Sequence, residues 1–371
     1  MIVLGYPEGS LELLQEGETM AQELKDGNAL AYFQSNMGFY YVTSGNDPVK
    51  GRKYLEKGLE WSEPTADVGI IAPATSALII SYTVEGNYAR VCQVTPKVIA
   101  LIEKTHTERE LFGRPDNIYS ALHSFYGLSL GGLGRFAEGE PFLEKGLFFA
   151  RDMNNLLSIA AVEMNYGIFY RIKGDGEKCV KHSRASIEYI EKSQFHMLLG
   201  LVWAWLGSGY RFSGRIDKAI KSAEKGLKIH TDLGVPFFLG SIHSTLGDSH
   251  LEAGNLKKAM VYAEQALDLS RKNNEKNGEA EARILLGRVI ASTERKQFDR
   301  AREQILKGIS MHEEHKRKPA YAIGLLYLGE IYAAAGQPEA ALENLKKSEI
   351  LFQEMGMVFW PDKAREILAA L

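Results

Sequence analysis

The spacing of apolar residues predicts helices along the whole chain. The segment 259–267 carries apolar residues at i, i+4, i+7 and i+8 from Ala259, the pattern of a helix that turns one face to a core. A similar helix, a turn and a second helix return about every 40 residues. The pairs that mark the first helices are Leu206-Gly207, Leu246-Gly247, Leu286-Gly287 and Leu328-Gly329, spaced 40, 40 and 42 residues apart. Self-similarity at a fixed period predicts a solenoid of helix pairs, each burying its apolar face against its neighbours.

The same register continues toward the N-terminus. It reaches Tyr166-Gly167, Tyr126-Gly127, Leu78-Ile79 and Met37-Gly38. The step from position 79 to position 127 is 48 residues, and the extra residues are expected within 104–117 as an elongated loop, because that segment holds Gly113 and Pro115. The predicted fold class is therefore an all-α superhelix of about eight helix pairs, with a partial N-terminal repeat and a C-terminal capping helix.

These elements predict a single continuous solenoid with three parts. Residues 1–27 form a partial repeat that has only its second helix, residues 28–357 form the helical repeats, and residues 358–371 form the capping helix. A first repeat without its leading helix is what a piece of a longer protein would show. It should also expose Leu11, Leu14 and Met20, through which two copies of the chain would associate.

Composition excludes some classes of function. With 44 Lys and Arg against 47 Asp and Glu, the net charge is −3, whereas nucleic-acid-binding proteins usually carry an excess of basic residues. The longest apolar runs, at 70–74 and 77–80, are too short to span a membrane, and the N-terminus does not read as a secretory signal. Cys92 and Cys179 are expected to be reduced packing residues. We expect a cytoplasmic protein that binds neither nucleic acid nor membrane.

One repeat carries a recognisable motif. Trp203-x-x-Leu206-Gly207-x-x-Tyr210, followed by Ala219, resembles the tetratricopeptide repeat. The period of 40 is longer than the usual repeat of about 34 residues and resembles the long repeats of bacterial signalling proteins such as the MalT-like regulators.

Three further segments extend the resemblance over essentially the whole chain. Leu4-Gly5-Tyr6-Pro7-Glu8, the sequence GRFAEG at 134–139 and the sequence EMGMVFW at 354–360 are similar to the C-terminal repeat regions of proteins with a class III adenylate or guanylate cyclase domain and a P-loop ATPase domain upstream. The resemblance implies a regulatory or interaction module. The chain itself contains no Gly-x-x-x-x-Gly-Lys-Ser/Thr phosphate loop.

Three local patterns could carry chemistry, and a structural interpretation is preferred for each. The sequence GLSLG at 127–131 matches a nucleophile elbow, but it falls inside a predicted helix instead of after a strand. His312 and His315 are spaced i, i+3 and have no evident third metal ligand. His243 and His250, with Asp248 between them, occupy packing positions of the repeat. We expect no enzyme activity, no cofactor, and no catalytic or metal-binding residues.

In a tetratricopeptide stack the first helix of each pair lines the concave side, and this implies a binding groove. Its mixture of charged and apolar residues suits a peptide or a partner helix, although a solvated charged face fits the same residues equally well. The predicted partner-binding residues are Arg171, Trp205, Ser208, Arg211, Phe212, Asp248, Glu252, Arg288 and Glu330. The lysines and asparagines of a carboxylate clamp are not visible, so an acidic peptide C-terminus is not the expected ligand.

The function these residues favour is a non-catalytic scaffold of a signalling protein that binds a partner protein or peptide in the concave groove. The alternative is a domain that senses a small effector, as the resemblance to MalT-like regulators would allow.

Overall fold

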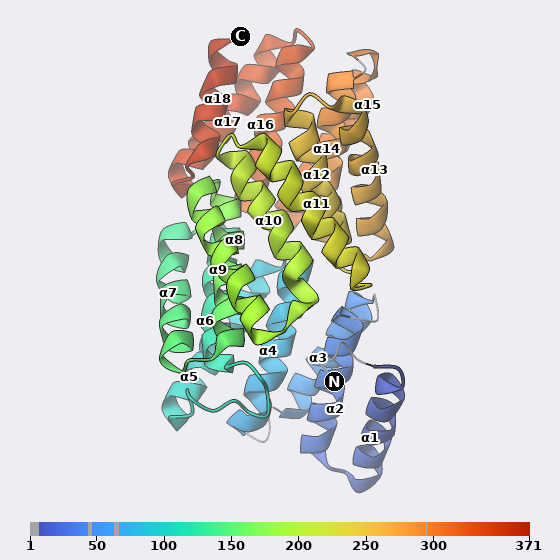
Figure 1. Cartoon of the computed structure of the whole chain (residues 1–371), viewed down its shortest axis with the longest axis vertical. Helices are drawn as coiled ribbons and strands as arrows, with labels where there is room; N and C mark the ends of the chain where they lie inside the picture. Colours follow the sequence, from blue (N-terminus) through green and yellow to red (C-terminus); the bar gives the residue numbers. More distant parts are fainter. Residues whose placement is uncertain (1–6, 44–46, 63–66, 294) are drawn as a thin grey trace.

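The computed structural model describes residues 7–43, 47–62, 67–293 and 295–371, and all regular structure in these residues is helical (Figure 1). Eight helix pairs are flanked by α1 (Ser10–Leu24) and α18 (Phe359–Ala369). The first helices of the pairs, here called A helices, are α2 (Gly27–Thr43), α4 (Val68–Glu85), α6 (Ile118–Gly132), α8 (Leu156–Lys173), α10 (Leu199–Phe212), α12 (Leu239–Glu252), α14 (Lys276–Thr293) and α16 (Lys318–Ala334). The second helices, the B helices, are α3 (Pro48–Ser62), α5 (Tyr88–Thr105), α7 (Phe136–Asp152), α9 (Gly176–Ser193), α11 (Ile216–Asp232), α13 (Leu256–Lys272), α15 (Phe298–Glu314) and α17 (Pro338–Met355). The predicted all-α superhelix is confirmed.

Local sequence sets where many of the helices begin and end. Asn117 and Asn155 cap α6 and α8, because their side-chain oxygens accept hydrogen bonds from the N–H groups of Ser120 and Ser158. Several A helices end at a turn glycine with positive φ, such as Gly174 (φ 80°) before α9. The elongated loop predicted within 104–117 is present, since α5 ends at Thr105 and α6 begins at Ile118.

Two A helices are about one turn shorter than their neighbours. Helices α10 and α12 have 14 residues each, whereas α8 and α14 have 18. The markers Gly207 and Gly247 remain 40 residues apart, so the first turn of each short helix is unwound instead of deleted. The unwound segments are 194–198, which contains a 3-10 turn, and 233–238, in which Phe238 adopts a φ of 62°.

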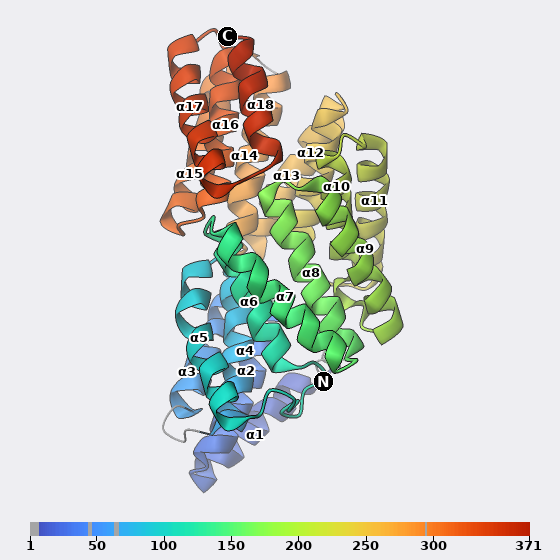
Figure 2. The same ribbon diagram turned by 90° about the vertical axis from the view of Figure 1, so that its left-hand side faces the viewer.

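The superhelix closes on itself along a seam. The C-terminal repeats lie above the first half of the chain in Figure 2, with α14 against α4 of the second pair and α16 against α8 of the fourth. Three consecutive A–B turns lie against side chains of the C-terminal repeats: Gly86 against Arg317, Gly134 against Met355 and Gly174 against Trp360. The Val358 N–H also donates to the carbonyl oxygen of Lys173 at 3.2 Å. These contacts join residues that are far apart in the sequence.

The N-terminal helix α1 only partly matches the expected exposed surface. The prediction was wrong for Leu14, which is 1% exposed, and Leu11 is half-buried. Met20 is 61% exposed, as expected, and it shares one face of α1 with the exposed Leu13 and Leu24. Leu14 is buried because it lies on the face of α1 that packs on α2. The Leu4-Gly5-Tyr6 part of the N-terminal motif lies outside the described residues.

One described helix, α4, is long and apolar enough to cross a membrane by length and composition alone. In this structure half of its residues are buried, and it packs against α2, α3, α5 and α6. This is the environment of a core helix in a helix stack.

Candidate functional site

The candidate site is a channel inside the superhelix, formed by the inner faces of the A helices. It has three parts that share lining residues. An apolar cavity lies between α4, α6, α8 and α10, and a polar chamber lies between α10, α12, α14 and α16. A smaller pocket, here called the constriction, lies between them: it shares Ile168, Trp205 and Phe238 with the cavity, and Arg171 and Glu281 with the chamber.

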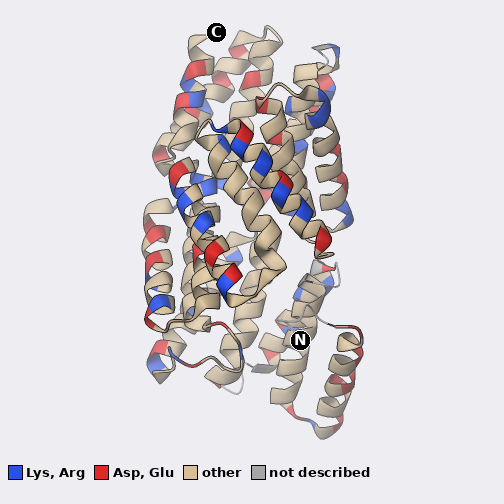
Figure 3. Ribbon diagram, viewed as in Figure 1, with Lys and Arg blue, Asp and Glu red and all other residues tan. Residues whose placement is uncertain are grey.

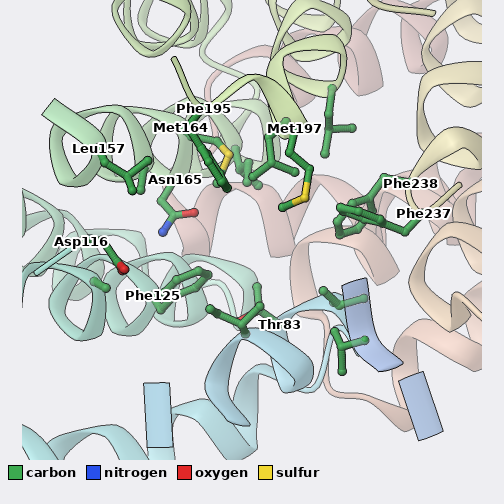
Figure 4. Close-up of a pocket in the computed structure, with 18 of the residues that line it drawn as sticks. Thr83, Asp116, Phe125, Leu157, Met164, Asn165, Phe195, Met197, Phe237 and Phe238 are labelled. Carbon is green, nitrogen blue, oxygen red and sulfur yellow. The ribbon is translucent and has the colours of Figure 1, made fainter. Parts of the chain in front are cut away.

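The apolar cavity has a volume of about 190 Å³. In Figure 4 the labelled side chains surround it from several elements, including Phe125 from α6, Met164 from α8 and Phe237 from the segment before α12. Both unwound segments contribute apolar side chains to its wall, namely Phe195, Met197 and Leu198 from one and Phe237 and Phe238 from the other. The unwinding of α10 and α12 therefore supplies a large part of the cavity wall.

Asn165 is a polar group within this apolar wall. Its side chain points into the cavity (Figure 4) and the residue is 0% exposed. The amide Nδ2 donates to Ser124 Oγ at 2.9 Å, whereas Oδ1 has no hydrogen-bond partner within the chain. A buried acceptor without a partner costs about 1–3 kcal/mol, so this oxygen is a place where a ligand donor would be favoured.

The polar chamber is crossed by ion pairs that link neighbouring repeats. Arg211 Nη1 lies 2.5 Å from Glu252 Oε1, and Arg288 Nη1 lies 2.6 Å from Asp248 Oδ1. Asp248 Oδ2 is also 4.0 Å from Arg211 Nη2, so one carboxylate lies between the two guanidinium groups. Arg288 stacks over the Tyr327 ring at 3.7 Å and lies 3.9 Å from a Glu330 oxygen.

These pairs keep the two buried arginines charged. Burial by itself would lower the pKa of Arg211, but the carboxylates of Glu252 and Asp248 outweigh burial and leave that pKa raised. Burial by itself would also lower the pKa of Arg288, but Tyr327 and the Asp248 carboxylate outweigh burial, so that this pKa too is raised. Paired and buried charges of this kind hold adjacent repeats in one register.

The comparisons with known proteins agree with this geometry. The family model described as tetratricopeptide repeat matches residues 239–273, which hold α12 and α13. No curated protein matches the sequence. Residues 239–273 thus form a tetratricopeptide repeat, and the chain as a whole has the fold of a tetratricopeptide-like solenoid. The finer resemblance to MalT-like and cyclase-associated proteins stays a prediction.

Solved tetratricopeptide-type structures share the fold over most of this chain. A Rap protein in complex with competence and sporulation factor has a TM-score of 0.57 at 12% identity, covering 92% of this chain and 96% of that chain. A Signal Transduction ATPase with Numerous Domains from Pyrococcus horikoshii, with a tetratricopeptide repeat sensor, has a TM-score of 0.52 at 15% identity. The match covers 93% of this chain and 52% of that protein, so the solenoid spans about half of its length. A human IFIT1 dimer with m7Gppp-AAAA has a TM-score of 0.50 at 18% identity, covering 92% and 77% of the two chains. At these identities the similarity shows the fold alone.

The solenoid brings most of the predicted groove residues together. The polar chamber is lined by Arg171, Ser208, Arg211, Phe212, Asp248 and Arg288. Glu252 and Glu330 stand beside it as carboxylate partners of the arginines, and Trp205 lines the constriction and the apolar cavity instead. Arg211 and Arg288 are only 7% and 6% exposed. Their contact with a partner stays a prediction, but their guanidinium groups already have partners within the chain.

Sequence reasoning missed Asn165, although the signal was present. Asn165 lies two residues before Gly167, the same inner position that Trp205 holds before Gly207. An amide at an inner position among apolar neighbours is unusual for a packing residue. The side chains of the unwound segments gave no such signal, because the period does not reveal that a helical turn is missing.

Two buried ionisable residues near the constriction were also missed. Glu275 Oε1 accepts hydrogen bonds from the Phe238 N–H at 2.7 Å and from Asn273 Nδ2 at 3.3 Å, and burial raises its pKa to about 7. Arg317 is 2% exposed and hydrogen-bonds to Asn277 Oδ1 and the Met311 carbonyl, and burial lowers its pKa. Glu275 holds the unwound segment before α12, whereas Arg317 joins α14 to α15, and neither residue is part of a recognisable motif.

The patterns that could have carried chemistry lie in ordinary helical surroundings. Ser129 of the elbow-like sequence is buried within α6, and His250 stacks on the Tyr262 ring with a centroid distance of 5.5 Å. His312 is 1% exposed, and burial lowers its pKa well below the usual range. Among the described residues no group of three or more His, Cys, Asp or Glu side chains is arranged to hold a metal ion. Both cysteines are free thiols, and burial raises the pKa of Cys92 to about 11.

Proposed function

We propose that this solenoid is a non-catalytic regulatory module that binds a peptide, or a segment of a partner protein, inside its superhelix. The observation that carries the proposal is the interior channel, in which an apolar cavity adjoins a polar chamber along the inner faces of the A helices. A binding site usually combines a mostly apolar wall with a few placed polar groups. The Rap structure, solved in complex with competence and sporulation factor, is consistent with a ligand-binding role for this architecture.

The charges of the channel favour a peptide over a nucleic acid. Human IFIT1, which shares the fold, was solved with m7Gppp-AAAA. In this chain, however, Arg211 and Arg288 are neutralised by carboxylates, and Arg171 lies 3.7 Å from Glu281. On the outer surface, acidic and basic residues are interspersed along α11 (Figure 3). A phosphate backbone would find few unpaired cations here.

The test compares peptide binding by two variants, one with a new charge inside the channel and one with the same substitution outside it. Thr83 lines both the cavity and the constriction, and its hydroxyl donates to the Ile79 carbonyl four residues back. Thr105 makes the same kind of bond to Leu101 but is exposed at the end of α5. Peptides selected from a displayed heptapeptide library on the immobilised chain should bind Thr83→Glu at least about ten-fold more weakly, and Thr105→Glu unchanged, by calorimetry.

Circular dichroism of both variants checks that they are folded. A library that yields no binding peptide, or a Thr83→Glu variant that binds as the parent does, would show the proposal to be wrong. The second candidate, sensing of a small effector, is favoured by the apolar lining of the cavity. It predicts that a small metabolite, with no peptide present, raises the melting temperature: at 100 times its Kd such a ligand stabilises the chain by about 2.7 kcal/mol.

A further inference from the structure

We infer that the apolar cavity is the anchor pocket of this interior site and takes one bulky, uncharged side chain of a peptide. In this arrangement Asn165 Oδ1 accepts a hydrogen bond from a backbone N–H next to that side chain. The inference rests on the proposed function and adds to it the place and the chemistry of recognition.

The size of the cavity fits a single side chain. An apolar cavity of about 150 Å³ holds a benzene molecule, whereas sites for drug-sized ligands begin at about 300 Å³. The cavity here, at about 190 Å³, therefore has room for one aromatic or large branched group.

The wall of the cavity selects an uncharged group. Its charged lining residues are Arg114 and Asp116, and these pair with each other through two contacts of 3.0 and 3.2 Å. A charged ligand group would lose its hydration without gaining a free counter-ion, which is costly in an apolar site. Aspartate, glutamate, lysine and arginine side chains are therefore excluded as the anchor.

The unpartnered oxygen of Asn165 adds a directional requirement. Because Nδ2 is held by Ser124, the carboxamide is fixed with Oδ1 as a buried acceptor that has no partner within the chain. A peptide offers a backbone N–H within a few ångströms of each side chain, so one residue would supply both the apolar group and the donor. That coincidence favours a peptide as the occupant over a simple hydrocarbon.

The unwound segments before α10 and α12, which line the cavity, are irregular in an otherwise regular repeat. Phe238 has a φ of 62°, a conformation that aromatic residues rarely adopt. The Glu275 carboxylate holds it there through the Phe238 N–H. Regular first turns of α10 and α12 would place the five apolar side chains of the unwound segments elsewhere. Departures from regular structure that are held by buried polar groups are typical of functional sites.

The test uses blocked tripeptides, Ac-Ala-X-Ala-NH2, as probes in ligand-observed NMR titrations. The peptides with X as Phe or Leu should bind and the peptide with X as Asp should not. Asn165→Leu keeps the shape of the side chain but removes the acceptor, and should weaken the Phe peptide about ten-fold, or about 1.4 kcal/mol. Methylating the Phe amide nitrogen should cause a similar loss in the parent chain and no further loss in Asn165→Leu.

Two other variants complete the design. Asn344→Leu is the matched control, since Asn344 also donates from Nδ2, to the Ala340 carbonyl, but lies on α17 away from the channel, and its affinity should equal that of the parent. Ala161→Phe fills the cavity from α8 and should abolish binding while the melting temperature stays at or above that of the parent.

The inference is overturned if Asn165→Leu and Ala161→Phe bind the Phe peptide as the parent does. It is also overturned if free indole binds and no tripeptide does, which would assign a small aromatic effector. Selected peptides that are sensitive to Thr83→Glu but not to Ala161→Phe would refute the anchor pocket and leave the proposed function standing. No peptide binding of any kind would refute both.

Discussion

At the scale of single residues, charged side chains that the sequence predicted to bind a partner form ion pairs with one another between neighbouring repeats. Arg288 and Asp248 are one period apart in sequence, and their pairing across 2.6 Å joins α14 to α12. The sequence placed both residues on the inner face, but it did not show that they neutralise each other. A residue that orients a partner and a residue that joins two repeats have the same side-chain chemistry, and only the neighbouring helix distinguishes them.

Glu275 gives a prediction at the same scale. Its pKa is raised from 4.5 to about 7 by burial, so ionisation disfavours the folded form. The cost is absent below about pH 4.5 and is fully present above about pH 7, where it amounts to about 3 kcal/mol. Glu275→Gln keeps an oxygen acceptor for the Phe238 N–H and should gain stability over the parent as pH rises. Urea unfolding at pH 5 and pH 8 measures this difference.

Glu366→Gln, at an exposed carboxyl on α18, controls for the loss of one surface charge. If Glu275→Gln is more stable than the parent by the same free energy at pH 5 and at pH 8, the raised pKa of the buried Glu275 carboxyl is contradicted.

At the scale of the elements, the turns between A and B helices are alike in backbone and different in surroundings. Gly174 and Gly254 have φ values of 80° and 74°, so both turns need the left-handed conformation. A methyl group on Gly254 would meet open space, whereas on Gly174 it would lie 2.7 Å from Nε1 of Trp360. Substitutions at these two glycines therefore distinguish the free-energy cost of the left-handed backbone from that of a clash at the seam.

Alanine at both positions should reveal the seam. Gly254→Ala should cost about 1–2 kcal/mol for the left-handed backbone alone. Gly174→Ala should cost a further 1–3 kcal/mol, roughly, because it overpacks the contact with Trp360. Denaturant unfolding of the two variants provides the comparison. Equal losses of stability in the two variants would mean that the contact with Trp360 accommodates the added methyl group at no cost in free energy.

At the scale of the whole molecule, closure of the superhelix depends on a small number of side chains from the C-terminal repeats. Trp360 is 3% exposed, and its ring lies 5.4 Å from that of Phe212 and 6.1 Å from that of Tyr327. It thus joins α18 to α10 and α16 and forms part of the wall of the polar chamber. A solenoid without such contacts would interact only between neighbouring repeats.

Trp360→Ala should therefore open the superhelix. We expect a loss of about 4 kcal/mol in stability and an increased radius of gyration in small-angle X-ray scattering. Trp61→Ala is the control, because Trp61 is 48% exposed on α3 and should leave the radius unchanged. A Trp360→Ala chain with the radius of the parent would show that the seam does not hold the closed form.

The sequence by itself determined the helices, their pairing, the position of the long loop and the inner faces of the A helices. These follow from a period of 40 and from short-range apolar spacing, which are local properties of the chain. Tertiary structure alone decided the closure of the superhelix, the pairing of the interior charges, the unwinding before α10 and α12, and the unpartnered acceptor of Asn165. Each of these depends on which residues from distant repeats meet. That is set by the sum of small rotations between many helix pairs, a quantity that no local pattern contains.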